Sequence, residues 1–77
     1  MKVLVVEDDL RSSDFIQRGL RENGHVVHHA ENGKDGLALA ASGKYDALIV
    51  DRMLPELDGL SIVKMLRAAE NHVPVLF

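Results

Sequence analysis

Two hydrophobic patterns alternate along the chain. Short runs that are apolar throughout and rich in β-branched residues are typical of strands buried on both faces of a parallel sheet. Between these runs, apolar residues recur at helical spacing, as Leu10, Ile16 and Leu20 do, with Phe15 adjacent. The predicted strands cover residues 2–6, 25–30, 46–50 and 73–77, and the predicted helices lie within 7–24, over about 34–42 and over 60–70.

This order of elements predicts the topology of the sheet. Strands that alternate with helices indicate a parallel sheet with helices on both faces. Right-handed crossovers place the first helix on one face and the other two on the opposite face if the strands lie in the order 2-1-3-4. We therefore predict a doubly wound α/β domain, whose ligand crevice lies at the carboxyl ends of strands 1 and 3.

Composition narrows the class of protein. The chain has 77 residues, 47% of them apolar, which is enough for the core of one small domain or part of one. The net charge of −3 and the lack of a basic run argue against direct binding of nucleic acid. No apolar stretch reaches the ~20 residues of a membrane helix, and the apolar run at the start, MKVLVVEDD, is too short for a signal peptide and lacks a cleavage site. We expect a soluble cytoplasmic protein without membrane contact.

Acidic residues follow two of the predicted strands. Glu7 and Asp8 come directly after the first strand and Asp51 directly after the third. Asp9 alone is most simply a helix cap. The other three carboxylates are expected to converge at the crevice, where two charges ~4 Å apart would repel by about 4 kcal/mol at an effective dielectric constant of ~20. Oxygen ligands of this kind suit Mg²⁺, which binds one or two carboxylates together with phosphate oxygens.

A dinucleotide site is the obvious competing hypothesis for this fold. Such a site needs glycines after the first strand, so that the backbone can approach a pyrophosphate. This chain has acids there. Gly33 and Gly36 follow the second strand instead, at the wrong spacing, and indicate a turn and the start of a helix.

The segments VLVVEDD, DRMLP and LDG resemble the receiver domain of bacterial two-component response regulators, which has a flavodoxin-like fold. The resemblance covers the whole chain. It implies that Asp51 accepts a phosphoryl group from a sensor histidine kinase and that Asp8 ligates Mg²⁺ with Glu7 beside it. Met53 would offer its backbone carbonyl to the metal. The segment RMLPELDGLSIV is most similar to receivers that carry a winged-helix DNA-binding domain, so the parent protein is expected to regulate transcription.

The family pattern extends beyond this sequence. It calls for a Ser or Thr just after the fourth strand and a Lys after a fifth, and both sense the phosphoryl group. We therefore expect residues 1–77 to be the N-terminal part of a receiver, without the fifth strand, the last two helices and the output domain, and without a working switch. The fourth strand would then be an open edge, and the sheet face beside the first helix would be partly uncovered. A homodimer through either surface is expected.

Two other functions remain open at this point. A Mg²⁺-dependent phosphatase of the aspartyl-phosphate type would need a second aspartate two residues after the nucleophile, where this chain has Met53. We therefore predict a phosphoacceptor rather than a turnover enzyme. An assembly scaffold that uses the partial fold without signalling is the third hypothesis, and phosphorylation by a small acyl phosphate distinguishes it from the first.

The four histidines also suggest a transition-metal site. On a strand, His25 and His28 point to opposite faces and cannot chelate one ion together. His29 and His72 complete the set, and polar surface positions are the simpler interpretation for all four.

Overall fold

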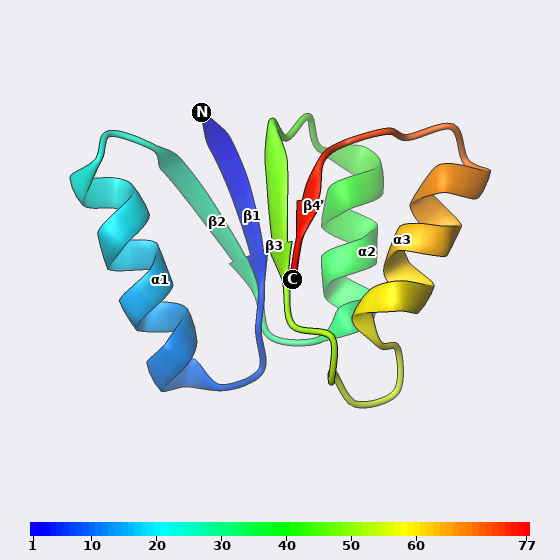
Figure 1. Ribbon diagram of the computed structural model, residues 1–77, viewed down its shortest axis with the longest axis horizontal. Coiled ribbons are helices and arrows are strands. Elements are labelled where there is room, and N and C mark those ends of the chain that lie inside the picture. The colour runs from blue at the N-terminus through cyan, green and yellow to red at the C-terminus, as the bar shows by residue number, and fades with distance from the viewer.

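Seven elements follow one another in the predicted order. A computed structural model describes residues 1–77 (Figure 1). The strands are β1 (Lys2–Val6), β2 (Val26–Ala30), β3 (Ala47–Val50) and β4 (Val75–Leu76), and the helices are α1 (Leu10–Glu22), α2 (Gly33–Ser42) and α3 (Gly59–Ala68).

The four strands form one parallel sheet in the order β2-β1-β3-β4. Figure 1 shows α1 on one side of the sheet and α2 and α3 on the other. This arrangement confirms the predicted doubly wound α/β fold. It also brings the carboxyl ends of β1 and β3 next to each other, because these two strands pair directly.

The core is divided by the sheet into two unequal parts. Successive side chains of a strand point to opposite faces, so β1 contributes to both. The larger part lies under α2 and α3 and consists of Leu4, Val6, Ala30, Ala40, Leu48, Val50, Leu54, Ile62 and Leu66. The smaller part lies under α1 and consists of Val3, Val5 and Val27, against which Ile16, Leu20 and Ile49 pack.

Three strands are shorter than the sequence predicts, and β3 begins at Ala47 rather than at residue 46. β2 begins at Val26 because the His25 N–H donates to the Leu20 carbonyl at 3.1 Å and so closes the end of α1 instead. β4 keeps only two residues. Pro74, just before it, has no N–H to donate, although its carbonyl accepts from Leu48 at 2.9 Å. The other bounds differ from the prediction by one or two residues.

The outer edge of β2 is partly occupied. Val26 donates to the Met1 carbonyl and Ala30 accepts from Glu7, so these residues face β1. In a parallel ladder every second residue bonds to the same neighbouring strand, so the main-chain groups of Val27 and His29 face outward. The outward carbonyl of Val27 accepts from the Arg21 guanidinium at 3.2 Å. A side chain thus takes the place of a neighbouring strand at this point.

The opposite edge of the sheet has no such cover. Leu76 and Phe77 are 63% and 56% exposed. Beside them a mainly apolar groove, lined in part by Val5, Ile16 and Ile49, lies between α1 and β4. No helix of the chain has the length and apolar character needed to span a membrane.

Candidate functional site

Main-chain hydrogen bonds fix the two places from which the acidic side chains project. The Glu7 N–H donates to the Ala30 carbonyl at 3.1 Å, and the Asp51 N–H donates to the Val6 carbonyl at 3.0 Å. Each bond continues a strand ladder by one residue past the end of the strand. The first residues after β1 and β3 are therefore held as firmly as the strands themselves.

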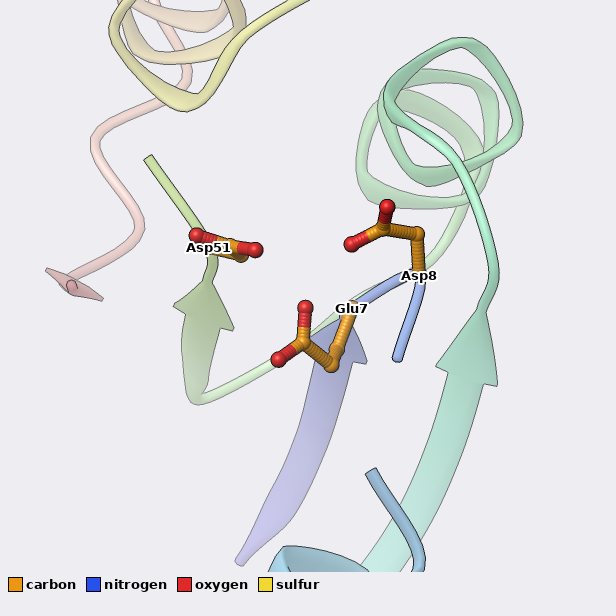
Figure 2. Close-up of side chains that lie close together, drawn as sticks. All are labelled: Glu7, Asp8 and Asp51. Atoms are coloured by element: carbon orange, nitrogen blue, oxygen red, sulfur yellow. The ribbon is translucent and has the colours of Figure 1, made fainter. Parts of the chain in front are cut away.

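Three carboxylates meet at this edge of the sheet. Oxygens of Glu7, Asp8 and Asp51 all lie within 4.8 Å of one another. Figure 2 shows Glu7 and Asp8 coming from the end of β1 and pointing toward the side chain of Asp51 at the end of β3. Asp8 is exposed, whereas Glu7 and Asp51 are half-buried. The convergence that the strand order predicted is present.

Glu7 carries the electrostatic cost of this arrangement. Partial burial, the hydrogen bond to Asp51 and the negative charge of Asp51 together raise its pKa to about 7. Its Oε2 atom is enclosed and has no hydrogen-bond partner. An enclosed carboxylate oxygen without a donor is a position that a cation satisfies. Three carboxylates, of which Glu7 is one, supply hard oxygen ligands that fit Mg²⁺.

The loop after β3 folds back over Asp51. The Met53 N–H donates to Asp51 Oδ1 at 3.0 Å, and the Met53 side chain is 84% exposed. Asp58 caps α3 by accepting from the Ser61 N–H at 2.8 Å, which ends the loop. The structure thus puts the main chain of Met53 next to the acidic cluster, while its side chain contributes nothing to it.

This loop leans on the first turn of α2. A Cβ atom at Gly33 would overlap the Leu57 carbonyl oxygen. Only glycine permits this approach, so Gly33 has a role that its position at the start of α2 did not reveal in the sequence. Glu56, next to Leu57, has a positive φ of 67°, which is a strained backbone conformation for a residue other than glycine.

The four histidines lie in four different environments. The ring of His25 lies 3.1 Å from the terminal amine of Met1, and that of His28 lies 2.8 Å from the Tyr45 hydroxyl. His72 is exposed before β4. His29 contacts the acidic cluster through the main chain, because its Nε2 lies 2.9 Å from the Glu7 carbonyl oxygen. Sequence reasoning placed His29 with the surface residues and missed this contact.

Comparison with known proteins covers nearly the whole chain. Residues 3–77 match the response regulator receiver domain. The chain is 47% identical over 76 residues to the probable transcriptional regulatory protein SilR of Salmonella typhimurium and 46% identical over 76 residues to the transcriptional regulatory protein CusR of Escherichia coli. These alignments cover 99% of this chain, but only 33% and 34% of those proteins. The chain therefore spans about a third of the length of these relatives.

Solved structures agree with this fold. The receiver domain of Francisella response regulator 1452 superposes with a TM-score of 0.93 at 40% identity, over 96% of this chain and 61% of that one. The response regulator TrrA of Thermotoga maritima, solved in complex with Mg²⁺-BeF, gives a TM-score of 0.90 at 30% identity, over 96% and 64%. TrrA has also been solved in complex with the histidine kinase ThkA, with a TM-score of 0.87 over the same shares of the two chains. The motif match and the sheet with acidic residues at its β1–β3 edge lead to one conclusion: the chain belongs to the receiver domains of two-component response regulators, a family of signalling modules related to transcriptional regulators.

Proposed function

We propose that Asp51 accepts a phosphoryl group from a sensor histidine kinase in a Mg²⁺-dependent reaction. The observation that carries this proposal is the convergence of three carboxylates around the enclosed, unpartnered Oε2 of Glu7. An Asp51 carboxylate oxygen attacks the phosphorus of a phosphohistidine, an O–P bond forms, and the P–N bond breaks with its electron pair returning to the imidazole. The product is an acyl phosphate on Asp51.

The residues that would hold the metal are Asp8, Asp51 and the backbone carbonyl of Met53, with Glu7 in the same acidic pocket. When bound, Mg²⁺ neutralises charge on the nucleophile and on the phosphoryl oxygens. The chain's own groups orient the nucleophile, because the Met53 N–H holds Asp51 Oδ1 and the Val6 carbonyl holds the Asp51 main chain. The complex of the relative TrrA with Mg²⁺-BeF supports this assignment.

We infer that the kinase docks beside α1. This helix begins three residues after Glu7, and two of its apolar side chains face solvent, Leu10 at 60% and Phe15 at 81% exposed. These exposed side chains flank the acidic cluster and offer apolar contact area to a partner that approaches Asp51. The complex of TrrA with the histidine kinase ThkA supports a partner of this class.

The parent protein, in this proposal, is a cytoplasmic transcriptional regulator that contacts DNA through an output domain. The transcriptional regulators SilR and CusR support this inference. Residues 1–77 are its N-terminal receiver part. The Ser or Thr and the Lys that the family pattern places beyond β4 are not among these residues.

As an isolated polypeptide, residues 1–77 are proposed to form a homodimer. The β4 edge and the groove beside α1 leave Leu76 and Phe77 more than half exposed, and a second copy that pairs with β4 or packs on this face covers them. Sedimentation equilibrium at tens of micromolar tests this. A folded species at the monomer mass of 8.5 kDa contradicts the dimer.

Phosphorylation by a small acyl phosphate tests the assignment of Asp51. The chain is incubated with the donor with and without Mg²⁺, the product is trapped by borohydride reduction, and the modified residue is identified by mass spectrometry. We expect modification of Asp51 only, dependent on Mg²⁺, and none in Asp51→Asn. Asp58→Asn, an aspartate outside the cluster, is the matched control and should be modified like the wild type. Modification at another residue, or equal modification of Asp51 without metal, contradicts the proposal.

A further inference from the structure

The acidic cluster has a neighbour that its carboxylates do not reveal. His29 lies on β2 opposite Val5 of β1, on the face of the sheet that α1 covers. Its Nε2 lies 2.9 Å from the Glu7 carbonyl oxygen. A carbonyl oxygen only accepts hydrogen bonds, so Nε2 must carry the hydrogen and donate. The contact therefore selects the Nε2–H tautomer of this ring.

This hydrogen bond completes a clamp on the main chain of Glu7. β1 ends at Val6, yet β2 holds both polar main-chain groups of the next residue. The Ala30 carbonyl accepts from the Glu7 N–H at 3.1 Å, and the His29 ring donates to the Glu7 carbonyl. A side chain thus continues the strand ladder where the strand itself has ended.

The clamp fixes more than one residue. The peptide unit from the Glu7 carbonyl to the Asp8 N–H is planar, so a fixed carbonyl direction also fixes the Cα atom of Asp8. From there only the φ torsion of Asp8 and its side-chain rotations decide whether its carboxylate reaches the cluster. Both acids of the β1 end depend on this one peptide plane, and His29 holds that plane from the neighbouring strand.

We propose that His29 is a positioning residue for the metal site, and that its Nε2–H orients the Glu7–Asp8 peptide so that both carboxylates reach the ion. The inference rests on the proposed function, since it concerns the same Mg²⁺ site. Groups that orient the ligands of a metal typically change its affinity by 10- to 100-fold when they are removed. A purely structural role predicts otherwise: loss of His29 would loosen the pairing of β1 with β2 and leave the affinity of the folded chain for Mg²⁺ unchanged.

The test compares His29→Gln with His29→Met in the 77-residue chain. The two replacements have similar length, but only the glutamine amide can donate to the Glu7 carbonyl. His28→Ala is the control, because His28 lies next in the same strand and bonds to Tyr45 instead. Titration with MgCl₂ alone, followed through the Asp8 amide signal by NMR, gives the affinity of the folded fraction. Thermal melting without metal measures stability separately.

We expect His29→Met to bind Mg²⁺ about 10-fold more weakly than the wild type, with His29→Gln and His28→Ala within about threefold of it. Equal affinities for the Met and Gln variants, with only the metal-free melting temperature changed, overturn the positioning role. If His29→Met does not fold, the ring tautomer of the wild type decides, since an Nδ1–H tautomer in the long-range ¹H–¹⁵N spectrum also overturns it. A wild-type chain that binds no Mg²⁺ refutes the proposed function itself, and the role of His29 with it.

Discussion

Replacing Glu7 by glutamine should remove the part of the pH dependence of stability that comes from the ionisation of Glu7. Glutamine resembles the protonated form of Glu7 and cannot become charged. Burial and the neighbouring Asp51 raise the pKa of Glu7 from 4.5 to about 7 in the folded chain. Between these two pH values the folded chain binds the proton more tightly than the unfolded chain does. The free energy of unfolding therefore falls as the pH rises through this window.

The size of the effect follows from the shift in pKa. A rise from 4.5 to about 7 corresponds to at most about 3 kcal/mol. Glu7 is only half-buried, so solvent screening reduces the expected loss to about 1 kcal/mol. Below pH 4.5 the group is protonated in both states and contributes no slope. Above pH 7 the whole loss is present.

Urea unfolding at pH 5, 6, 7 and 8 measures this difference, with EDTA present and the protein concentration held fixed. The wild type should lose about 1 kcal/mol more than Glu7→Gln between pH 5 and pH 8, because contributions from other groups cancel in the comparison. Glu31→Gln, which changes an exposed acid after β2, should keep the wild-type slope. Parallel pH profiles for wild type and Glu7→Gln would refute the reasoning. When millimolar Mg²⁺ replaces EDTA, it should restore much of the wild-type stability at pH 8, and less of the stability of Glu7→Gln.

Three further substitutions test the loops that carry the site. Asn32 caps α2, since its Oδ1 accepts from the Asp35 N–H at 2.8 Å. Asn32→Ala removes this cap and should lower the free energy of unfolding in urea by about 1 kcal/mol, whereas Asn32→Asp should lower it much less. Glu56→Gly relieves a φ of 67° and should raise the urea midpoint slightly; a lower midpoint contradicts strain at this residue. Gly33→Ala forces the loop after β3 away from α2 and should weaken both the stability of the chain and its binding of Mg²⁺. Gly19 has free space around it, so Gly19→Ala should stabilise α1 by up to about 1 kcal/mol and leave Mg²⁺ binding unchanged. Equal effects of the two glycine substitutions would refute the close approach at Gly33.

The sequence was sufficient for the sheet and for the acids at its edge. Continuous apolar runs identified β1 and β3, and parallel strands end at a common edge, so Glu7, Asp8 and Asp51 had to meet. β4 was predicted too long, because an apolar run does not reveal that only Val75 and Leu76 pair with β3. The place of His25 depends on the closure of α1, in which the Gly24 and His25 N–H groups donate to the Arg21 and Leu20 carbonyls, a local pattern that glycine at this position favours.

The supporting residues of the site were harder to find. His29 and Gly33 act through a carbonyl oxygen and through close packing, and both contacts join segments that are far apart in the sequence. Neither residue belongs to the acid motif. A histidine in a strand and a glycine before a helix each have a common structural explanation. Only the structure reveals that His29 contacts Glu7 and that Gly33 contacts Leu57.

The hydrogen bond from Arg21 to Val27 bears on how the isolated polypeptide can aggregate. A sheet with two open edges can add strands at both and grow into a filament, whereas a sheet with one open edge can pair only once. Arg21 occupies the outward carbonyl of Val27 on β2, which makes that edge a poor template for another strand. The β4 edge is left as the surface for pairing. Assembly of the polypeptide should therefore stop at a dimer. Arg21→Ala removes the guanidinium, exposes the β2 edge to pairing as well, and should allow fibres to form.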